Sequence, residues 1–574
     1  MDNRQLSEVF TLIANLSEIK GENIYKTLAY RKAAESLQGL GGDINQYWKE
    51  GRLEDIPGVG KAISEKINEL LSTGKLEFLE KLKKEVPPGL ADLMQVPGLG
   101  PKKVALIWKE LGITTMPDLE KAARAGKLNG LPGMGKKTEE QILAGIESLA
   151  HRSGRIPLGQ AYPLAQQIIA ALLKVPGVKA ASPAGSLRRM RPTVGDLDIL
   201  VSSKDSGPVM QAFTTLPGVS RVLGQGSTKS SIEFNSGVRA QVWVHPPEHF
   251  GTALLYATGS KDHNVHLREI ALDQGLSLSE HSLTRTKGSG EITCSTEEQV
   301  YAALGLPWIP PELREDRGEI QAAQAGKLPK LIELPDIHAD LQVHSNWSDG
   351  KLSMLEMARA AAKRGMKVIA FTDHSLSLGV ANGLSIERHA GQQKEIDQAQ
   401  KELGNSIQIL HATEVEIKAD GSLDYPDEFL ASLDLVLASL HSSLRQPRQK
   451  VTERLIKAIH NPNVDIIGHP TGRIIPDREG ADLDMPAVLA AAAESGVALE
   501  INAHPARLDL DDVAARSAKE MGIPISINTD SHSEADLDML HFGVAMARRA
   551  WLTKQDVINC WSKEKLLKWL KQRG

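Results

Sequence analysis

The chain has 574 residues, too many for a single hydrophobic core, so several compact domains are expected. Its formal net charge of -5 gives no general attraction to nucleic acid, so any DNA binding must come from local basic patches. The two cysteines, Cys294 and Cys560, exclude a disulfide framework and a cysteine metal cage. No segment approaches the roughly 20 apolar residues of a membrane span, and the N-terminus has no basic stretch leading into an apolar run. We therefore expect a soluble, cytoplasmic protein with no membrane partner.

A Pro-Gly-x-Gly motif occurs three times in the N-terminal region and predicts a helix, a tight turn and a second helix at each copy. The copies are Ile56-Pro57-Gly58-Val59-Gly60, Val96-Pro97-Gly98-Leu99-Gly100 and Leu131-Pro132-Gly133-Met134-Gly135. The backbone N–H groups of such a turn can bind a DNA phosphate without recognising sequence, and nearby lysines add charge contacts. The DNA-binding candidates are Gly58, Gly60, Gly98, Gly100, Gly133 and Gly135, with Lys61, Lys66, Lys102, Lys103, Lys136 and Lys137 beside them. Ordinary helical turns with solvated lysines are the alternative.

Between Leu158 and about Gln241, short apolar runs alternate with helical stretches, which predicts an α+β unit. Its most specific run is Gly185-Ser186-Leu187-Arg188-Arg189, followed by Gly195-Asp196-Leu197-Asp198. Aspartates at i and i+2 on a strand point to the same face and can share divalent metal ions. The backbone N–H groups and the hydroxyl of the Gly-Ser turn can donate hydrogen bonds to a triphosphate, and an arginine can neutralise the negative charge of that triphosphate. This spacing indicates a nucleotidyltransferase, whereas an Asp-x-Asp pair alone is more often a solvated strand edge.

The segment from Glu312 to about Pro335 has the mixed charges and flanking prolines of an interdomain linker with at most a short helix. After it, apolar runs alternate with alanine-rich helices, which predicts parallel strands in a barrel of βα units. The expected strands are Lys367–Thr372, Leu435–Ser439, Val464–Gly468, Val497–Asn502 and Pro524–Asn528.

Histidines and carboxylates stand at the ends of nearly every predicted strand of this region, on the usual catalytic face of a βα barrel. Imidazoles and carboxylates suit zinc, manganese or iron, and a carboxylate such as Glu414 can bridge two ions. Clustered ions would activate a water and clamp the phosphoryl oxygens of a phosphodiester. Each histidine alone is better explained as a hydrogen-bonded structural residue, but their shared position favours metal binding.

The α+β unit resembles the family X DNA polymerases, and the similarity continues through Tyr256-Ala257-Thr258-Gly259-Ser260 and His263-Asn264 to Arg268. The resemblance implies that Asp196 and Asp198 are catalytic and hold Mg or Mn. It implies nucleotide binding by Gly185, Ser186, Arg189, Gly195 and Asn264, and template contact by Arg268. Ala257 stands where the family usually has an aromatic residue, so sugar discrimination by that side chain is not expected.

Gln241 is a more serious departure from that family. The family supplies a third catalytic aspartate from a strand that here contains Val238-Arg239-Ala240-Gln241-Val242. A glutamine amide is neutral and a poor base, so it replaces neither the metal ligand nor the proton acceptor. Glu233, eight residues upstream, is expected on the preceding strand and is no obvious substitute. DNA synthesis is therefore predicted to be weak and favoured by manganese, or absent.

The three repeats resemble helix-hairpin-helix motifs. The segment Tyr30-Arg31-Lys32-Ala33-Ala34, followed by Ile56 to Lys66, resembles the lyase domain of DNA polymerases of the beta type. The resemblance implies that Lys66 forms a Schiff base with an abasic-site sugar. A lysine can do this only if desolvation or cationic neighbours leave some free amine near neutral pH. A solvated lysine without this role is the alternative.

The C-terminal region resembles the polymerase and histidinol phosphatase (PHP) domain over its whole length. The implied metal ligands are His344, Asp349, His374, Glu414, His441, His469, Asp530 and His532. The PHP pattern usually begins His-x-His, whereas Gln342 stands at the first position, which predicts one loosely held or exchangeable ion. Arg473 and Arg507, on loops beyond two of these strands, are candidates for binding DNA phosphates.

Together the resemblances imply a multidomain fold: an all-α helix-hairpin-helix N-terminal region, an α+β nucleotidyltransferase palm with a thumb, and a C-terminal distorted βα barrel. The expected domains are lyase-like (1–85), fingers-like with two helix-hairpin-helix motifs (86–153), palm (154–250), thumb (251–315), linker (316–335) and PHP phosphoesterase (336–574).

The implied function is DNA repair, by weakened gap-filling synthesis and a metal-dependent 3′→5′ exonuclease in the PHP domain. Abasic-site lyase, abasic-site endonuclease and 3′-phosphatase activities are further options. The implied partners are gapped or nicked DNA and dNTPs, the cofactors are Mg or Mn at the palm and two or three Zn, Mn or Fe ions at the PHP site, and a monomer is expected. An active polymerase with an assisting PHP domain, a DNA-end-binding scaffold with structural metals, and a histidinol-phosphate phosphatase are the alternatives.

Overall fold

The computed structural model describes residues 1, 3–38, 44–56, 58–94, 96, 99–151, 155–287 and 289–573. The chain divides into two compact units, residues 1–154 and residues 155–574. Across the described ranges, every helix is too short or too polar to cross a membrane.

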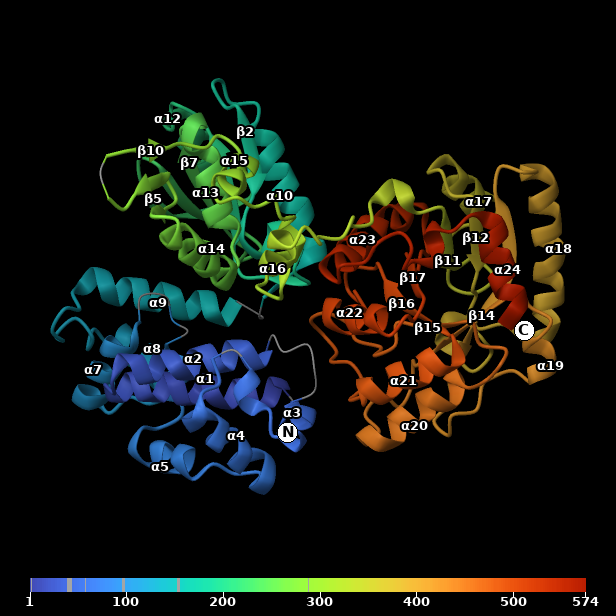
Figure 1. Cartoon of the computed structure of the whole chain (residues 1–574), viewed down its shortest axis with the longest axis horizontal. Coiled ribbons are helices and arrows are strands. Elements are labelled where there is room, and N and C mark those ends of the chain that lie inside the picture. Colours follow the sequence, from blue (N-terminus) through green and yellow to red (C-terminus); the bar gives the residue numbers. More distant parts are fainter. Residues whose placement is uncertain are drawn as a thin grey trace. The chain divides into compact units, whose positions relative to one another are not determined.

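In the first unit, all the secondary structure that is described is helical, as predicted for a helix-hairpin-helix region. Its elements are α1 (Asn3–Lys20), α2 (Ile24–Gln38), α3 (Ile44–Lys49), η1 (Leu53–Asp55), α4 (Lys61–Thr73), α5 (Glu77–Glu85), α6 (Leu90–Leu93), α7 (Pro101–Leu111), α8 (Met116–Arg124) and α9 (Lys136–His151). Helices α1 and α2 lie side by side (Figure 1). The buried apolar side chains of both helices, such as Phe10 and Tyr30, join a core that extends to Ile146 of α9.

The three repeated motifs share one backbone hydrogen bond between described residues. The backbone N–H two residues before each helix donates to the carbonyl three residues earlier, from Val59 to Ile56, Leu99 to Val96 and Met134 to Leu131, at 2.9, 3.0 and 3.0 Å. Helices α4, α7 and α9 then begin directly after Gly60, Gly100 and Gly135. The first glycine of two copies has a positive φ, 80° at Gly58 and 72° at Gly133, a conformation that few other residues adopt. Gly98 lies outside the described residues.

The second unit begins with a mixed five-stranded sheet in the order β2-β4-β7-β6-β5. The strands are β2 (Ala180–Pro183), β4 (Leu197–Ser202), β5 (Val219–Gln225), β6 (Lys229–Phe234) and β7 (Arg239–His245), with a separate pair β1 (Ile156–Pro157) and β3 (Thr193–Val194). Helices α10 (Leu158–Leu172), α11 (Gly185–Arg188) and α12 (Gly207–Thr214) accompany them. Strands β4 and β7 are parallel neighbours in this sheet. This mixed sheet with helices fits the predicted palm.

The segment after the sheet has its own apolar core around Leu267 and Tyr301. It contains η2 (Pro247–His249), α13 (Phe250–Thr258), α14 (Lys261–Asp273), β8 (Leu276–Leu278), β9 (Leu283–Arg285), β10 (Glu291–Ile292) and α15 (Glu297–Ala303). The predicted linker continues with η3 (Pro311–Leu313), α16 (Glu319–Gln324) and η4 (Leu334–Asp336). Ile320 of α16 is fully buried in the same core, so this stretch packs as part of the fold.

The last part of the chain is a seven-stranded parallel sheet whose strands follow one another in sequence order. They are β11 (Ala339–Val343), β12 (Val368–Phe371), β13 (Gln408–Glu416), β14 (Leu435–Ser439), β15 (Ile466–Gly468), β16 (Ala498–Asn502) and β17 (Ile525–Asn528). The first and last strands adjoin, because the backbone N–H of His344 donates to the carbonyl of Ser531 at 2.9 Å. The sheet is therefore nearly closed into the predicted barrel. The five runs predicted as strands correspond to β12 and to β14 through β17.

Helices surround this barrel (Figure 1). They are α17 (Met354–Lys363), α18 (Ile386–Leu403), α19 (Asp427–Leu430), α20 (Arg448–Ile459), α21 (Met485–Ser495), α22 (Asp512–Glu520), α23 (Leu540–Arg549) and α24 (Lys563–Arg573), with short turns η5 (Gly379–Ala381), η6 (Glu534–Met539) and η7 (Ile558–Cys560). The strands are buried on both faces, for example over all five residues of β14, as expected when helices cover a parallel sheet.

Candidate functional site

The carboxylate of Glu414 lies at the centre of a ring of imidazoles at one end of the barrel. Its Oε1 is 3.2 Å from Nε2 of His441 and 2.9 Å from Nε2 of His469. Its Oε2 is 3.5 Å from Nε2 of His344 and 3.2 Å from Nδ1 of His374. The four histidines follow four different strands, β11, β12, β14 and β15, whereas Glu414 lies within β13, two residues before the end of that strand. The parallel barrel thus brings together, at one end, side chains that are far apart in the sequence.

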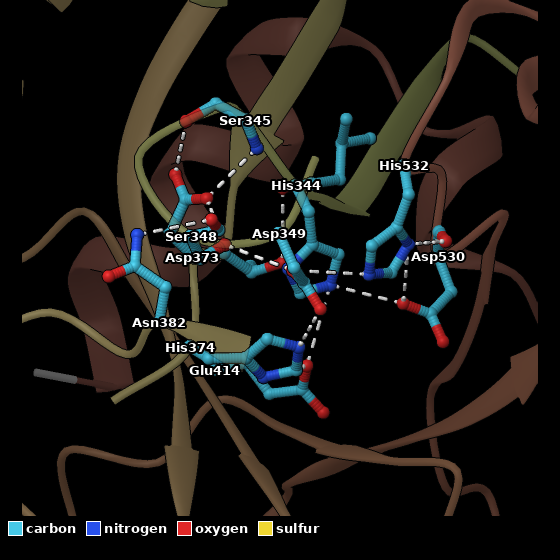
Figure 2. Close-up of polar contacts among 12 residues, drawn as sticks. His344, Ser345, Ser348, Asp349, Asp373, His374, Asn382, Glu414, Asp530 and His532 are labelled. Carbon is cyan, nitrogen blue, oxygen red and sulfur yellow. Dashed lines mark hydrogen bonds and ion pairs between the residues drawn. The ribbon is translucent and has the colours of Figure 1, made fainter. Parts of the chain in front are cut away.

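A second group extends this ring toward the loop after β17. Nε2 of His344 is 3.0 Å from Oδ1 of Asp530, and Nε2 of His532 is 3.3 Å from Oδ1 of Asp349. Nε2 of His374 is 3.6 Å from Oδ2 of Asp349. Figure 2 shows these side chains pointing toward one another. All eight predicted ligands therefore lie in one cluster.

The donor atoms of this cluster fit metal ions. Buried nitrogens of His344, His374, His441 and His469 have no hydrogen-bond partner, although buried polar atoms nearly always have one. Three overlapping groups have ligand atoms within 4.8 Å of one another: His344, Asp349, His374 and His532; His374, Glu414 and His441; and His344, Glu414 and Asp530. Such nitrogen and carboxylate sets suit zinc, manganese or iron.

The electrostatics of the cluster keep its carboxylates ionised, as metal binding requires. Burial raises the pKa of Asp349, but His532, His374 and His344 outweigh it and lower the pKa to about 2. Burial likewise raises the pKa of Glu414, but His441 and His374 bring it well below its ordinary value. The pKa of His374 falls to about 3, mainly because burial disfavours its charged form.

Two buried acids that the sequence analysis did not single out orient this cluster. Oε2 of Glu416 is 2.8 Å from Nδ1 of His441, which leaves Nε2 of that ring to face Glu414. Asp373 accepts hydrogen bonds from Oγ of Ser345 at 2.7 Å and from Oγ of Ser348 at 2.5 Å (Figure 2). Outer partners of this kind fix ligand orientation. Their signal in the sequence was an acid within two residues of a predicted ligand, Asp373 before His374 and Glu416 after Glu414.

Gln342 of β11 stands where the PHP pattern has its first histidine, and its amide faces Glu500 of β16. With the amide nitrogen oriented toward that carboxylate, it donates to Oε2 of Glu500 at 3.0 Å. Glu500 also accepts from Nδ2 of Asn528 at 2.7 Å and from the backbone N–H of His469 at 2.7 Å. Gln342 is thus part of a buried polar network behind the metal ligands.

Arg507 reaches the metal cluster, whereas Arg473 supports the loop on which Arg507 lies. Nε of Arg507 is 3.4 Å from Oδ2 of Asp530. Nε of Arg473 donates to the backbone carbonyl of Arg507 at 2.7 Å. Only Arg507 therefore places a cation beside a candidate metal ligand.

The predicted palm site lies on the parallel strands β4 and β7. Asp196 directly precedes β4, and Asp198 pairs in register with Gln241 of β7. Burial and the neighbouring Asp196 raise the pKa of Asp198 to about 6. Glu233 of β6 is paired with two arginines, since its Oε1 is 3.2 Å from Arg221 and its Oε2 is 3.1 Å from Arg239. The position predicted for the third carboxylate is therefore occupied by an amide.

The Gly-Ser turn lies directly against these carboxylates. Gly185, which opens the short helix α11 containing Ser186, has a φ of 59°, and a Cβ there would be 2.8 Å from Oδ2 of Asp198. Arg188 is committed elsewhere, because its guanidinium donates to both carboxylate oxygens of Glu297 at 2.6 and 2.7 Å. Arg189 donates to the carbonyl of Thr258 at 2.5 Å and to Oε1 of Glu315 at 3.1 Å. Gly195 immediately precedes Asp196.

Asn264, a nucleotide-binding candidate, and Arg268, a template-contact candidate, line a small pocket between α13 and α14. Its walls include Tyr256, Asn264 and Arg268. Nδ2 of Asn264 donates to the carbonyl of Tyr256 at 2.8 Å, while Oδ1 is buried without a hydrogen-bond partner. Nε of Arg268 donates to the carbonyl of Asn264 at 3.2 Å. Tyr256, Asn264 and Arg268 thus lie together in the structure.

In the first unit, Lys66 of α4 lies beside a second lysine and an aromatic ring. Its Nζ is 5.3 Å from the ring centre of Phe78, and Nζ of Lys26 is 5.0 Å from the same ring. Nζ of Lys66 donates to the carbonyl of Ala62 at 3.3 Å. The ring of Phe78 thus has the ammonium groups of both Lys26 and Lys66 close to it.

Comparisons with known proteins agree with both halves of this description. Family models match the helix-hairpin-helix domain at residues 1–76, the SAM-like helix-hairpin-helix tandem at 90–148, the DNA polymerase beta thumb at 253–315 and the PHP domain at 340–504. The chain is 40% identical over 577 residues to a DNA polymerase/3′-5′ exonuclease PolX of Bacillus subtilis (strain 168), with 100% of each chain covered.

Two further relatives cover the two parts separately. DNA polymerase lambda of Rattus norvegicus is 27% identical over 350 residues, which span 54% of this chain and 56% of that protein. A probable phosphatase of Thermoanaerobacter sp. (strain X514) is 34% identical over 217 residues, which span 36% of this chain and 83% of that protein.

Proposed function

The chain belongs to the family X DNA polymerases with a C-terminal PHP domain, and we propose that it repairs DNA by two activities. The PHP metal centre removes nucleotides from a 3′ end, and the palm fills gaps with reduced efficiency because Gln241 replaces a catalytic carboxylate. Gapped or nicked DNA and dNTPs are the proposed substrates. We assign Mg or Mn to Asp196 and Asp198, and two or three Zn, Mn or Fe ions to the barrel. A cytoplasmic location and a monomeric state remain predictions.

The exonuclease proposal is carried by the central carboxylate of Glu414, which has imidazole nitrogens of four loops within 3.5 Å. A carboxylate with two oxygens directed at separate groups of imidazoles is suited to bridge two ions. Ions held there would activate a water and neutralise the phosphoryl oxygens. The protein itself supplies fixed orientation, through Glu416 behind His441, and a cation, Arg507, beside Asp530 for a substrate phosphate.

The helix-hairpin-helix turns are the proposed contacts to the DNA backbone. Helices α4, α7 and α9 begin directly after the last glycine of the three motifs. Lys61, Lys102 and Lys136 lie in the first turns of these helices. Contacts of this kind bind phosphates without base recognition.

One experiment tests both activities together. A labelled gapped duplex is incubated with Mn²⁺, with and without dNTPs, for the parent protein, Gln241→Asp and His344→Ala. We expect shortening without dNTPs in the parent and in Gln241→Asp, no shortening in His344→Ala, and faster extension in Gln241→Asp than in the parent. Intact nuclease activity in purified His344→Ala would refute the PHP assignment.

A scaffold that only binds DNA ends is not favoured, because the full-length relative is named for both activities and the ligand cluster is complete apart from Gln342. A metal-replete protein that binds gapped DNA without degrading it would support the scaffold.

Abasic-site lyase activity is a second proposed function of the first unit. It is supported by Lys26 and Lys66, which both approach the ring of Phe78. In this proposal the Lys66 amine is the nucleophile that attacks the abasic-site sugar to form a Schiff base.

A further inference from the structure

Arg549, the last residue of α23 in the PHP domain, has a fully buried guanidinium that contacts the nucleotide site of the palm. Its Nη1 donates to the backbone carbonyl of Arg189 at 2.6 Å and to Oε1 of Glu315 at 3.0 Å. Its Nη2 donates to Oδ2 of Asp512 at 2.7 Å. The side chain has an exposed fraction of 0%. A residue of one domain is thus anchored in the phosphate-binding turn of the other.

Glu315 connects the two arginines. Its Oε1 is 3.1 Å from Nε of Arg189 and 3.0 Å from Nη1 of Arg549. Burial raises the pKa of Glu315, but Arg549 and Arg189 outweigh it, so that the pKa is lowered and the carboxylate stays ionised. Arg189 is therefore held on both sides, by its carbonyl and by its guanidinium.

This arrangement has an electrostatic consequence for a bound triphosphate. An ionised carboxylate next to Arg189 competes with the triphosphate for that guanidinium and repels the triphosphate itself. The charge of Arg549 compensates Glu315 in a buried setting, where a lone charge is costly. Arg189 can then direct a net positive charge toward the nucleotide.

We propose that Arg549 is a positioning residue for the nucleotide site, so that the PHP domain contributes to dNTP binding by the palm. It fixes the carboxyl end of the turn that contains Ser186, and it neutralises the carboxylate behind Arg189. This inference rests on the proposed function, in which Arg189 binds the triphosphate.

The contact between the domains does not depend on Arg549 alone. The ring of Tyr162 in α10 packs edge-on against Phe542 of α23, with centres 5.6 Å apart. A Cβ on Gly159 would be 2.7 Å from Cβ of Pro505, so the two backbones approach closely there. Loss of the Arg549 guanidinium should therefore leave the domains packed together.

The test measures binding of a non-hydrolysable dATP analogue with Mn²⁺ to the full chain on a one-nucleotide gapped duplex, by calorimetry. Arg549→Met should raise the Kd of the analogue about 5- to 10-fold, the usual size of coupling between sites. Arg549→Lys, which keeps the charge but loses the fork of donors, should give a smaller increase.

Arg548→Met is the matched control. Arg548 is the adjacent arginine of α23, but it donates to Oε1 of Glu312 at 2.7 Å and to the carbonyl of Ile332 at 3.0 Å, not to Arg189. The Kd of the dATP analogue for Arg548→Met should stay within about twofold of the parent value, since the ion pair of Arg548 does not involve the turn that contains Ser186. An equal increase in Arg548→Met would overturn the inference, because general loosening of the interface would then explain both.

Arg189→Met separates this inference from the proposed function. Weaker binding in Arg189→Met with parental binding in both Arg549 variants would overturn the role of Arg549. Parental binding in Arg189→Met would overturn the nucleotide role of Arg189 itself. In a Glu315→Gln background, Arg549→Met should cost less than in the parent, because residue 315 then carries no charge for Arg549 to compensate; an undiminished cost would overturn the electrostatic part.

Discussion

Gln241 of β7 lies directly opposite Asp198 of β4, in register on neighbouring parallel strands. A carboxylate at that position would share metal ions with Asp198, whereas the amide is neutral. Gln241→Asp should therefore increase single-nucleotide insertion into a gapped duplex, by about 100-fold or more if it restores one electrostatic contact to the transition state.

The measurement uses primer extension with Mn²⁺ in a His344→Ala background, so that degradation does not mask synthesis. Gln241→Asn is the control, because it shortens the side chain without adding charge. Equal and vigorous synthesis by the parent and Gln241→Asp would show that Gln241 does not limit the reaction.

Loss of a ligand at the barrel site should reduce both bound metal and exonuclease activity. His344→Ala and Asp530→Ala each remove one candidate ligand. Both residues belong to the group that includes Glu414, and His344 also belongs to the group that includes His374. Glu416→Gln removes only the partner of His441, so a decrease of about 10- to 100-fold is expected there and a larger one for the two ligands.

Metal analysis of the purified proteins and degradation of labelled single-stranded DNA provide the two measurements. His460→Ala is the control, because His460 lies at the end of α20 and contacts Ser495 rather than the cluster. Unchanged metal content in both ligand variants would contradict the assignment.

Gln342→His should increase the number of tightly bound ions per chain. The amide of Gln342 is directed at Glu500, and the ligand cluster lacks the first histidine of the PHP pattern. A histidine there would supply the missing nitrogen. Metal content after dialysis against a weak chelator distinguishes the variants. Loss of an ion in Gln342→Ala would instead identify Gln342 as a ligand.

Glu297→Gln should destabilise the contact between palm and thumb. Glu297 is buried and accepts two hydrogen bonds each from Arg188 and Arg314. Burial raises its pKa, but Arg314 and Arg188 outweigh it and place the pKa far below the ordinary value. Breaking such a pair costs about 3–5 kcal/mol.

The pH dependence follows from the direction of that shift. A lowered pKa stabilises the fold above the unfolded pKa of about 4.3, and this stabilisation is lost as the pH falls further. The parent and Glu297→Gln should therefore differ most near neutral pH, and the difference should narrow progressively as the pH falls below about 4, in denaturant unfolding followed by tryptophan fluorescence. Glu298→Gln, at the exposed neighbouring position, should match the parent throughout.

Lys66 should form a covalent adduct with abasic DNA. Borohydride reduces a Schiff base to a stable bond, so the adduct is trapped and seen as a slower band on a denaturing gel. Lys66→Ala should abolish the adduct, whereas Lys61→Ala, one turn earlier on α4, should retain it. Absence of an adduct in the parent, or an undiminished adduct in Lys66→Ala, would refute the lyase proposal.

Local patterns in the sequence were sufficient to predict much of the fold. The five C-terminal runs became strands because apolar residues buried on both faces of a parallel sheet give continuous runs that sequence displays directly. The Pro-Gly-x-Gly turns were predictable for a similar reason, since a positive φ at Gly58 and Gly133 requires glycine. The eight barrel ligands were assigned through the resemblance to the PHP domain, because histidines and carboxylates stand near the ends of the strands.

Contacts between distant segments were not predictable in this way. The stretch expected to be a linker is packed, because Ile320 fills the core around Tyr301 and Arg317 pairs with Asp512 at 3.0 Å. The roles of Glu416, Asp373 and Glu500 depend on which neighbours surround them in space.

The sequence by itself determined the families, the ligand types and the substitution at Gln241, because these are properties of residue identity and short spacing. Only the tertiary structure decided that Gln241 faces Asp198, that the amide of Gln342 is directed at Glu500 and that Arg549 supports Arg189. Those relationships arise from strand register and domain packing, which bring together residues as far apart as 189 and 549 and which no local pattern encodes.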